Sequence, residues 1–461
     1  MPSLQTTFHS GEDCRCSRSG FGRVMPAGFR AALMSLGSSI LVLAERSLVQ
    51  RMVFGDSPEP LSVWANIVYS VALILLVFFP LASAISIIGI WAERKVSGHI
   101  QSRIGPNRVG PFGLLQSIAD GVKLIFKEDL IPKQADHFLF RIAPYLAFAP
   151  VFAAFLALPF GPDMTFETSL NVGVFYVLAV LSLEIMGVIL AGWGSNNKWS
   201  LYGAMREACQ MVSYEIPLGI SIIVAVMAAG TLNMYQMSLM QGDGLHDWLI
   251  FRNPFVFLAF FLYFVASLAS NKRAPFDLPE SESELVAGFH TEYSGMRWVF
   301  FFFAEYASMF IVAAIQVALF LGGWHDPFGL VQYLYGQAQG SSLALLGVNL
   351  LAAGIFIAKC STLLFVQMWI RWTLPRPRID QVLYACVKVL LPLSCVLLLG
   401  AALWQLFIHE HTMVAFATQI VLAALGVMFF LAIVAWIGYA FVTGRRLQKR
   451  LAEPEPILVG Q

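Results

Sequence analysis

The sequence predicts an all-α, polytopic integral membrane protein with about nine transmembrane helices. Apolar residues make up 58% of the 461 residues and charged residues only 12%, against about 45–50% and about 25% in soluble globular proteins. Apolar runs of spanning length recur along the chain, and Lys and Arg gather in alternate loops. Together these observations exclude a disordered chain, a nucleic-acid-binding protein and an ordinary cytosolic enzyme.

Nine apolar runs, bounded by Gly, Pro or charged residues, are long enough to cross a bilayer, which takes about 20 residues. They lie near Val63–Trp91, Leu139–Phe160, Val172–Trp193, Met211–Leu232, Pro254–Ser270, Trp298–Gly322, Leu343–Trp369, Val387–Ile408 and Met413–Thr443. We interpret residues 1–61 as an N-terminal extension, 62–411 as a core of eight helices, and 412–461 as an additional helix with a basic tail.

The basic residues predict the orientation, because loops rich in Lys and Arg stay in the cytoplasm. One set of loops holds twenty Lys and Arg, and the intervening loops hold one, Arg252. The pattern predicts an outside N-terminus and a cytoplasmic C-terminus. Six Arg in the first 60 residues disagree with it, so this segment either lies on the membrane surface or precedes a later start such as Met52. We expect a protein beginning at Met52 to insert and assemble normally.

The cysteines predict that the chain carries no metal cofactor of its own. None of the six forms the repeated Cys-x-x-Cys spacing of a zinc or iron–sulfur site. Cys14 and Cys16, two residues apart, are interpreted as lying in an N-terminal tail without a catalytic role.

The first cytoplasmic loop predicts a short amphipathic helix. Gly105-Pro106-Asn107 and Gly110-Pro111 form turns, and apolar residues then recur at helical spacing, as expected for a helix at the membrane surface. These residues are Leu114, Leu115, Ile118, Val122 and Ile125. The charged residues between Glu93 and Asp129 fit two readings, a topological anchor and a docking surface for another protein.

Three carboxylates fall inside or near the ends of predicted spans: Glu184, Glu215 and Glu305. A charge there costs several kcal/mol, so such a residue is a candidate functional group. Pro217 leaves the carbonyl of Ser213 without its helical partner, which favours a bent, hydrated helix beside Glu215. We interpret Glu215 and Glu305 as proton-transfer groups; the alternative is a buried Glu paired with Lys or Arg.

The loop from Arg273 to Met296 is strongly acidic. Pro279 is suited to a helix start, and a helix there would place Asp277, Glu280 and Glu284 on one face. With Glu282 and Glu292, five carboxylates in an enclosed site would have to share protons. The alternative is a solvated loop that contacts basic residues of a partner subunit.

Several motifs resemble the H-subunit (NuoH) family of bacterial NADH:quinone oxidoreductase, complex I, which is equivalent to mitochondrial subunit 1. The similar stretches run from about Ser62 to Leu393. They are Glu93–Asp129, Gly192–Lys198, Ser213–Ile216, Arg273–Met296, Ala304–Tyr306 and Leu374–Gln381.

The resemblance implies a place in the bacterial inner membrane, at the heel of the membrane arm. There the family forms part of the quinone chamber with quinone-module subunits of the peripheral arm, and begins a proton path toward adjacent membrane subunits. NADH, flavin and iron–sulfur clusters belong to partner subunits, and quinone is the substrate. A quinone needs an apolar passage ending in polar groups, for which Arg103, Arg108, Arg273 and Phe276 are the candidates. For Arg103 and Arg108, contact with lipid headgroups or a partner subunit is an equal alternative.

The sequence departs from the family where many members have Ala-Glu-Thr-Asn, because it reads Ala269-Ser-Asn-Lys. Conversely, Glu184 and Glu207 stand where relatives commonly carry a small apolar residue. We therefore expect Glu184 or Glu207 to substitute for the carboxylate absent at Ser270. Glu207 would lie about 12 Å from Glu215 along a continuous helix.

Three rival functions differ in what they require. A membrane-bound hydrogenase subunit shares the fold, but the closely similar Glu93–Asp129 and Arg273–Met296 loops favour complex I. A stand-alone ion transporter would show inverted repeats and broken helices, which the sequence lacks. A structural scaffold does not account for intramembrane carboxylates.

Overall fold

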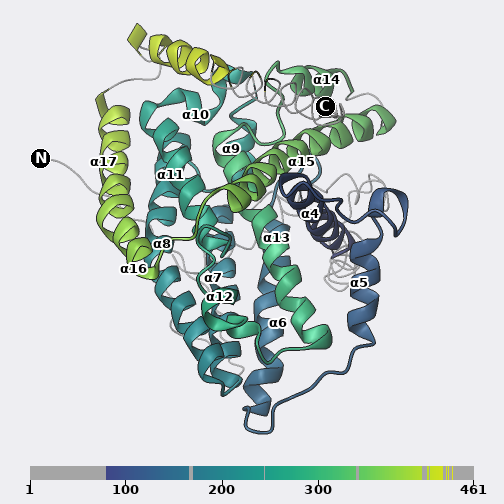
Figure 1. Ribbon diagram of the computed structural model, residues 1–461. Coiled ribbons are helices and arrows are strands. Elements are labelled where there is room, and N and C mark those ends of the chain that lie inside the picture. Colours follow the sequence, from purple (N-terminus) through teal and green to yellow (C-terminus); the bar gives the residue numbers. More distant parts are fainter. Residues whose placement is uncertain are drawn as a thin grey trace, which may run out of the picture. The chain divides into compact units, whose positions relative to one another are not determined.

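The computed structural model describes residues 79–165, 170–242, 244–338, 342–407 and parts of 413–439. Within them every regular element is a helix, as Figure 1 shows, so the all-α prediction is confirmed. The predicted extension 1–61, the start of the first predicted span and the basic tail lie outside the described residues, as do Cys14 and Cys16.

The long helices are α4 (Phe79–Ile100), α6 (His137–Ala154), α7 (Gly173–Gly194), α8 (Lys198–Ala229), α11 (Pro254–Ser270), α13 (Gly295–Phe320) and α15 (Ser342–Thr373). The next span consists of α16 (Ile379–Tyr384), a π-helical segment (Ala385–Leu390) and α17 (Leu391–Phe407). Short helices connect them: α5 (Gln116–Ile125), α9 (Met234–Leu239), α10 (Leu249–Arg252), α12 (Glu282–Leu285) and α14 (Leu330–Ala338).

Six helices in the described part of the chain are long and apolar enough to cross a membrane. They are His137–Ala157, Gly173–Gly194, Lys198–Ala229, Gly295–Phe320, Leu343–Thr373 and Ile379–Phe407. Pro254–Ser270 and Phe416–Met428 are shorter apolar helices. The chain is therefore a polytopic membrane protein, and the count of nine spans stays a prediction.

Polar residues at the helix ends determine where several spans begin. Asp136 accepts hydrogen bonds from the backbone N–H groups of Phe138 and Leu139 at the start of α6. Asn197 caps α8 and Asn253 caps α11 in the same way. These side chains satisfy amide groups that a helix leaves without partners at its first turn.

Helix α13 forms the centre of the packing, because every residue from Ala304 to Phe320 is buried. It packs against α4, α6, α11 and α15, and α15 crosses it obliquely in Figure 1. Small residues bring α6, α7 and α8 close together: a Cβ on Gly187 would lie 2.5 Å from the Ala147 nitrogen, and one on Gly192 2.3 Å from the Ala204 Cβ. Close contact of this kind is typical of helices packed in membranes.

Two predictions about the basic-side loops have different outcomes. The short helix of the first loop is confirmed as α5, with Ile118, Val122 and Ile125 exposed. The predicted start of the fourth span at Met211 is wrong, because α8 begins at Lys198. Its first turns carry polar residues that a search for apolar runs excludes, and the structure pairs them with the loop that follows α11.

Candidate functional site

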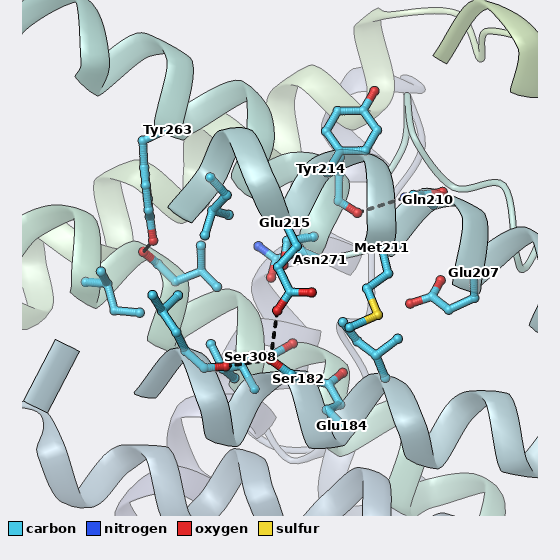
Figure 2. A pocket seen from close by; sticks show the side chains of 18 residues that line it. Ser182, Glu184, Glu207, Gln210, Met211, Tyr214, Glu215, Tyr263, Asn271 and Ser308 are labelled. Carbon is cyan, nitrogen blue, oxygen red and sulfur yellow. Dashed lines mark hydrogen bonds between the residues drawn. The ribbon is translucent and has the colours of Figure 1, made fainter. Parts of the chain in front are cut away.

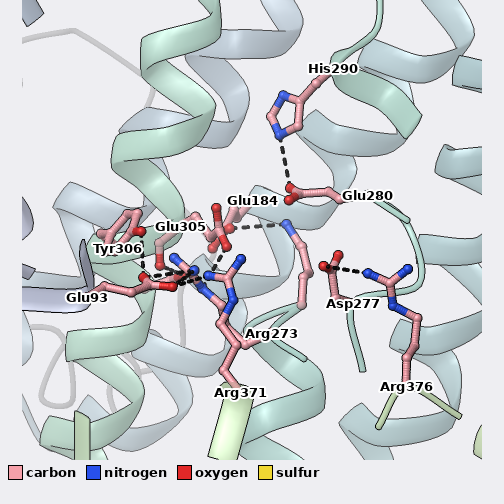
Figure 3. A network of polar contacts seen from close by, with 12 residues as sticks. Glu93, Glu184, Arg273, Asp277, Glu280, His290, Glu305, Tyr306, Arg371 and Arg376 are labelled. Atoms are coloured by element: carbon pink, nitrogen blue, oxygen red, sulfur yellow. Dashed lines mark hydrogen bonds and ion pairs between the residues drawn. The ribbon is translucent and has the colours of Figure 1, made fainter. Parts of the chain in front are cut away.

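The candidate site lies where the acidic loop, defined here as residues 271–294, meets charged residues of α4, α7, α8 and α13. Figure 3 shows its polar contacts. Gly203 on α8 makes this packing possible, since a Cβ there would lie 2.9 Å from both the Phe289 nitrogen and the Pro279 oxygen. Gly288 has a φ of +56°, and a Cβ on it would lie 1.8 Å from the same Pro279 oxygen. Glycine is therefore required at both positions.

Arg273 is the centre of a first buried group, which we call the arginine cluster: Glu93, Arg273, Glu305, Tyr306 and Arg371. The Arg273 guanidinium lies 3.1 Å from Glu93 and 2.7 Å from Glu305. Arg371 also pairs with Glu93, and the Tyr306 hydroxyl donates to Glu93 over 2.6 Å. Two carboxylates thus face two guanidinium groups, which offsets the cost of burying each charge.

Lys272 is the centre of a second buried group, the lysine cluster: Glu184, Glu207 and Lys272. The Lys272 ammonium lies 3.3 Å from Glu184 on α7 and 3.6 Å from Glu207 on α8. All three residues are at most 6% exposed. Burial alone would lower the pKa of Lys272, but the charges of Glu207 and Glu184 raise it above its usual value. The ammonium therefore stays charged between two carboxylates.

The carboxylates of the acidic loop do not share one helical face, so that prediction is wrong. Helix α12 covers only Glu282–Leu285, and both Asp277 and Glu280 precede it. Three of them instead pair with separate residues: Asp277 with Arg376 at 3.2 Å, Glu280 with His290 of the same loop at 2.9 Å, and Glu284 with Arg206 at 2.5 Å. Glu292 accepts a hydrogen bond from Asn197. These tertiary pairs outweigh the tendency of Pro279 to start a longer helix. The side chain of Glu282 lies outside the described residues.

Two neighbouring carboxyl groups of this loop have opposite pKa shifts. Burial, together with the negative charge of Glu280, raises the pKa of Asp277 to about 6. Burial also acts to raise the pKa of Glu280, but the His290 contact and the charges of Arg273 and Lys272 lower it overall. Groups that titrate apart in this way suit proton exchange near neutral pH.

Glu215 lies inside the helix bundle beside a cavity between α7, α8, α11 and α13 (Figure 2). Ser182 on α7 donates a hydrogen bond to Glu215 over 2.7 Å. Glu184, Glu207 and Ser270 line the same cavity. Helix α8 continues past Pro217 as one helix, so Glu207 and Glu215 face one cavity from a single element.

The cavity has the polar lining that buried water requires. It offers about 40 Å³ to the centres of water molecules, and one water needs about 10–15 Å³. The buried atoms on lining residues that have no hydrogen-bond partner among the described residues include Glu207 Oε2, Gln210 Oε1 and Asn271 Nδ2. Because buried polar atoms are normally hydrogen-bonded, two or three waters fit this cavity chemically and sterically.

The predicted quinone-contacting residues divide into two groups. Arg103 and Arg273 line a pocket of about 240 Å³ together with Glu93, Glu280 and Arg371. Phe276 lies elsewhere, with its ring 5.3 Å from that of Tyr214 and its carbonyl accepting a hydrogen bond from Gln210. Arg108 is exposed on the first loop.

Three cations of the site carry no site role in the prediction from the sequence: Lys272, Arg371 and Arg376. Each pairs with a carboxylate of the site. In the sequence Arg371 and Arg376 serve only as markers of orientation. Their position in or beside the Leu374–Gln381 motif could have indicated a role in the site, because this motif is more polar than a simple membrane anchor needs to be.

The fold and the site define a polytopic membrane protein that holds ionisable groups within and at the edge of its helix bundle. The sequence profile of the NADH dehydrogenase family matches residues 71–402. Proteins named as the H subunit of NADH-quinone oxidoreductase are similar over most of their length. That of Chlorobaculum parvum is 48% identical over 68% of this chain and 87% of its own. That of Anaeromyxobacter dehalogenans is 43% identical over 82% and 91%. The chain belongs to this family, the H subunits.

Proposed function

We propose that the chain is the membrane subunit of a proton-pumping NADH-quinone oxidoreductase that forms part of the quinone chamber and begins the proton path. Family membership supports the first part, since the relatives are named as subunits of that enzyme. The roles in the quinone chamber and the proton path are supported by one observation: charged groups follow one another from the pocket lined by Arg103 and Arg273 to Glu215. In this proposal the subunit is inactive alone.

The quinone head would bind beside the arginine cluster. A pocket of about 360 Å³ lies between α4, α5 and α13 and is lined by the aromatic residues Trp298, Phe302 and Phe303. The charged residues Arg94, Asp120, Lys123 and Lys127 line it as well. Phe302 also lines the pocket that contains Arg103 and Arg273. An isoprenoid quinone needs apolar walls that end in a few polar groups, and the aromatic residues would supply those walls.

Quinone reduction would act on the acidic loop through charge. Reduction to quinol takes up two electrons and two protons, so the charge beside Arg273 changes during turnover. Glu280 lines the pocket that contains Arg103 and Arg273, and Asp277 is coupled electrostatically to Glu280. Their protonation would change with that of the quinone, and Glu305, paired with Arg273, would respond in turn.

The proton path would continue from the lysine cluster to Glu215. Ser270 lines the same cavity as Glu184 and Glu207, which supports the idea that these residues replace the carboxylate that many relatives carry at the Ser270 position. Water in the cavity would connect Glu207 with Glu215. If Glu184→Gln and Glu207→Gln each left pumping unchanged, this substitution would be refuted.

The remaining parts of the enzyme are assigned to other chains. NADH, flavin and iron–sulfur clusters would belong to peripheral-arm subunits that dock on the basic side, and small membrane subunits would continue the proton path. The complex would lie in the bacterial inner membrane, surrounded by lipid, with the C-terminus in the cytoplasm. The twenty basic residues of one set of loops support this orientation.

Purification through a C-terminal tag tests the assignment. Flavin and iron–sulfur subunits in the mild-detergent extract, with NADH-dependent quinone reduction, are the expected result. A nickel–iron hydrogenase partner would identify a hydrogenase instead, and a chain without partners would favour the transporter.

Proton pumping tests the acidic loop. Glu280→Gln/Glu282→Gln/Glu284→Gln should lower pumping per NADH, with Glu128→Gln in the first loop as a matched control. Full retention in the triple variant would refute the coupling of this loop to pumping.

A further inference from the structure

Two adjacent residues, Lys272 and Arg273, join the two buried clusters. The Lys272 side chain reaches Glu184 and Glu207 on α7 and α8, whereas the Arg273 side chain reaches Glu93 on α4 and Glu305 on α13. Lys272 has a φ of +55°, in the left-handed region, which directs the chain through a tight turn directly after α11. Any displacement of this turn would move both cations.

The two clusters differ in their balance of charge. The arginine cluster has two carboxylates and two guanidinium groups, so its net charge is zero. The lysine cluster has two carboxylates and one ammonium, so its net charge is −1 when both carboxylates are ionised. Two further carboxylates act on Lys272: Glu280 on the acidic loop and Glu305 on α13. Arg273 is its neighbour in the chain.

One cation between two buried carboxylates controls how many protons they hold. Two carboxylates in one enclosed site cannot both ionise cheaply, so without a cation they share a proton. With the ammonium of Lys272 between them, both can ionise. Glu207 Oε2 has no hydrogen-bond partner among the described residues, and Glu207 lines the cavity that leads to Glu215.

We propose that Lys272 is the positioning residue that loads and unloads this proton site. In contact with both carboxylates, the ammonium keeps the site empty of protons. When the turn moves with the acidic loop, the ammonium withdraws and one carboxylate takes up a proton from the quinone side, which brings the two carboxylates from −2 to −1. Return of the ammonium releases that proton through the cavity to Glu215. Lys272 keeps its own three protons throughout, and this mechanism rests on the function proposed above.

The test compares a single and a double variant in the whole complex, in sealed membrane vesicles with NADH and quinone. Lys272→Gln leaves two carboxylates that hold a proton between them, so protons pumped per NADH should fall at least about twofold while quinone reduction continues. Glu184→Gln/Lys272→Gln leaves Glu207 as the one titratable group of the lysine cluster. It should recover at least about half of the lost pumping.

A purely structural role for Lys272 would give a different result. If Lys272 only ties α7 to α8, both variants lose the tie, and the double variant should pump no better than the single one. That result, or unchanged pumping in Lys272→Gln, would overturn the proposal. Because pumping is expressed per NADH oxidised, a smaller amount of assembled complex does not affect the comparison.

Glu215→Gln separates this inference from the proposed function. Loss of pumping in Glu215→Gln supports the path itself, whatever the lysine variants do. Unchanged pumping in Glu215→Gln would overturn the path, and with it the role of Lys272. Ser182→Ala is the matched control, because it removes the hydrogen bond to Glu215 but keeps the carboxyl.

Discussion

The arginine cluster and the lysine cluster lie on opposite sides of one turn, yet they are built differently. In the arginine cluster Glu93 has three partners: Arg273, Arg371 and the Tyr306 hydroxyl. In the lysine cluster Glu207 has only an ammonium at 3.6 Å, and one of its oxygens has no partner among the described residues. The first arrangement is saturated with donors, and the second is open to one more proton.

The difference indicates two uses of buried charge. A balanced group of guanidinium and carboxylate, with forked hydrogen bonds, fixes the relative positions of α4, α13, α15 and the acidic loop. An unbalanced group beside a cavity with room for water would respond to a change of one proton. The arginine cluster is therefore suited to hold the site in place, and titration is the role proposed for the lysine cluster.

The largest expected effect comes from removing the central cation of the saturated cluster. Arg273→Met would leave Glu93 with Arg371 and the Tyr306 hydroxyl, and Glu305 without its guanidinium, in an environment where both carboxylates are at most 8% exposed. Loss of one partner from a buried ion pair costs about 3–5 kcal/mol, so little intact complex should assemble. Native gel electrophoresis of membranes measures this.

Arg371→Gln is the matched control for Arg273→Met. The Arg371 side chain is 28% exposed, and Glu93 keeps Arg273 when it is removed, so assembly should fall much less. Equal amounts of complex in Arg273→Met and in the unmodified protein would contradict the structural role of the arginine cluster, and with it the distinction between the two clusters.

A smaller effect concerns Asp277, which pairs with Arg376 at the edge of the acidic loop. Burial and the charge of Glu280 raise its pKa from 3.8 to about 6. Its contribution to stability is therefore present below pH 3.8 and is lost as the pH rises through about 6. Asp277→Asn should remove this dependence, which amounts to at most about 3 kcal/mol at 1.36 kcal/mol per pKa unit.

Thermal inactivation of the purified complex, measured on each side of the Asp277 pKa of about 6, tests this expectation. The difference between the two conditions should be smaller in Asp277→Asn than in the unmodified complex. Asp129→Asn is a suitable control, since Asp129 also pairs with an arginine, Arg297, but is more exposed. The same pH dependence in all three proteins would contradict the assignment to Asp277.

The spans and the intramembrane carboxylates were predictable because each is a local signal. An apolar run of about 20 residues reports a helix without any tertiary information, and Glu184 and Glu215 stand out against apolar neighbours. Glu207 was found only by comparison with the family, since α8 is polar on that side. The start of α8 was missed for the same reason: Arg206, Glu207 and Gln210 interrupt the apolar run, and their partners lie at least 59 residues away in the sequence.

The pairing of the site was beyond sequence reasoning because its partners are remote. Glu93 and Arg371 are 278 residues apart, and only the packing of α4 and α15 on α13 brings them together. The acidic loop shows the opposite error, in which a local rule was applied too far. Pro279 and the offsets of three and seven predict one helical face, but Asp277, Glu280 and Glu284 each pair with a different residue, Arg376, His290 and Arg206.

The smallest expected effect tests the exposed end of the acidic loop. Arg206 and Glu284 lie 2.5 Å apart, but the Glu284 side chain is 51% exposed, and ion pairs open to solvent contribute about 0–1 kcal/mol. Glu284→Gln should therefore change assembly and pumping little. Glu280→Gln removes a charge that is 23% exposed and lies between His290 and the pocket lined by Arg103 and Arg273, so it should lower pumping clearly. Parallel proton-to-NADH ratios for the two variants measure this. If Glu284→Gln lowered the proton-to-NADH ratio more than Glu280→Gln did, burial would not distinguish the carboxylates that take part in pumping from those that do not. The contrast between the arginine cluster and the lysine cluster would then lose its physical basis.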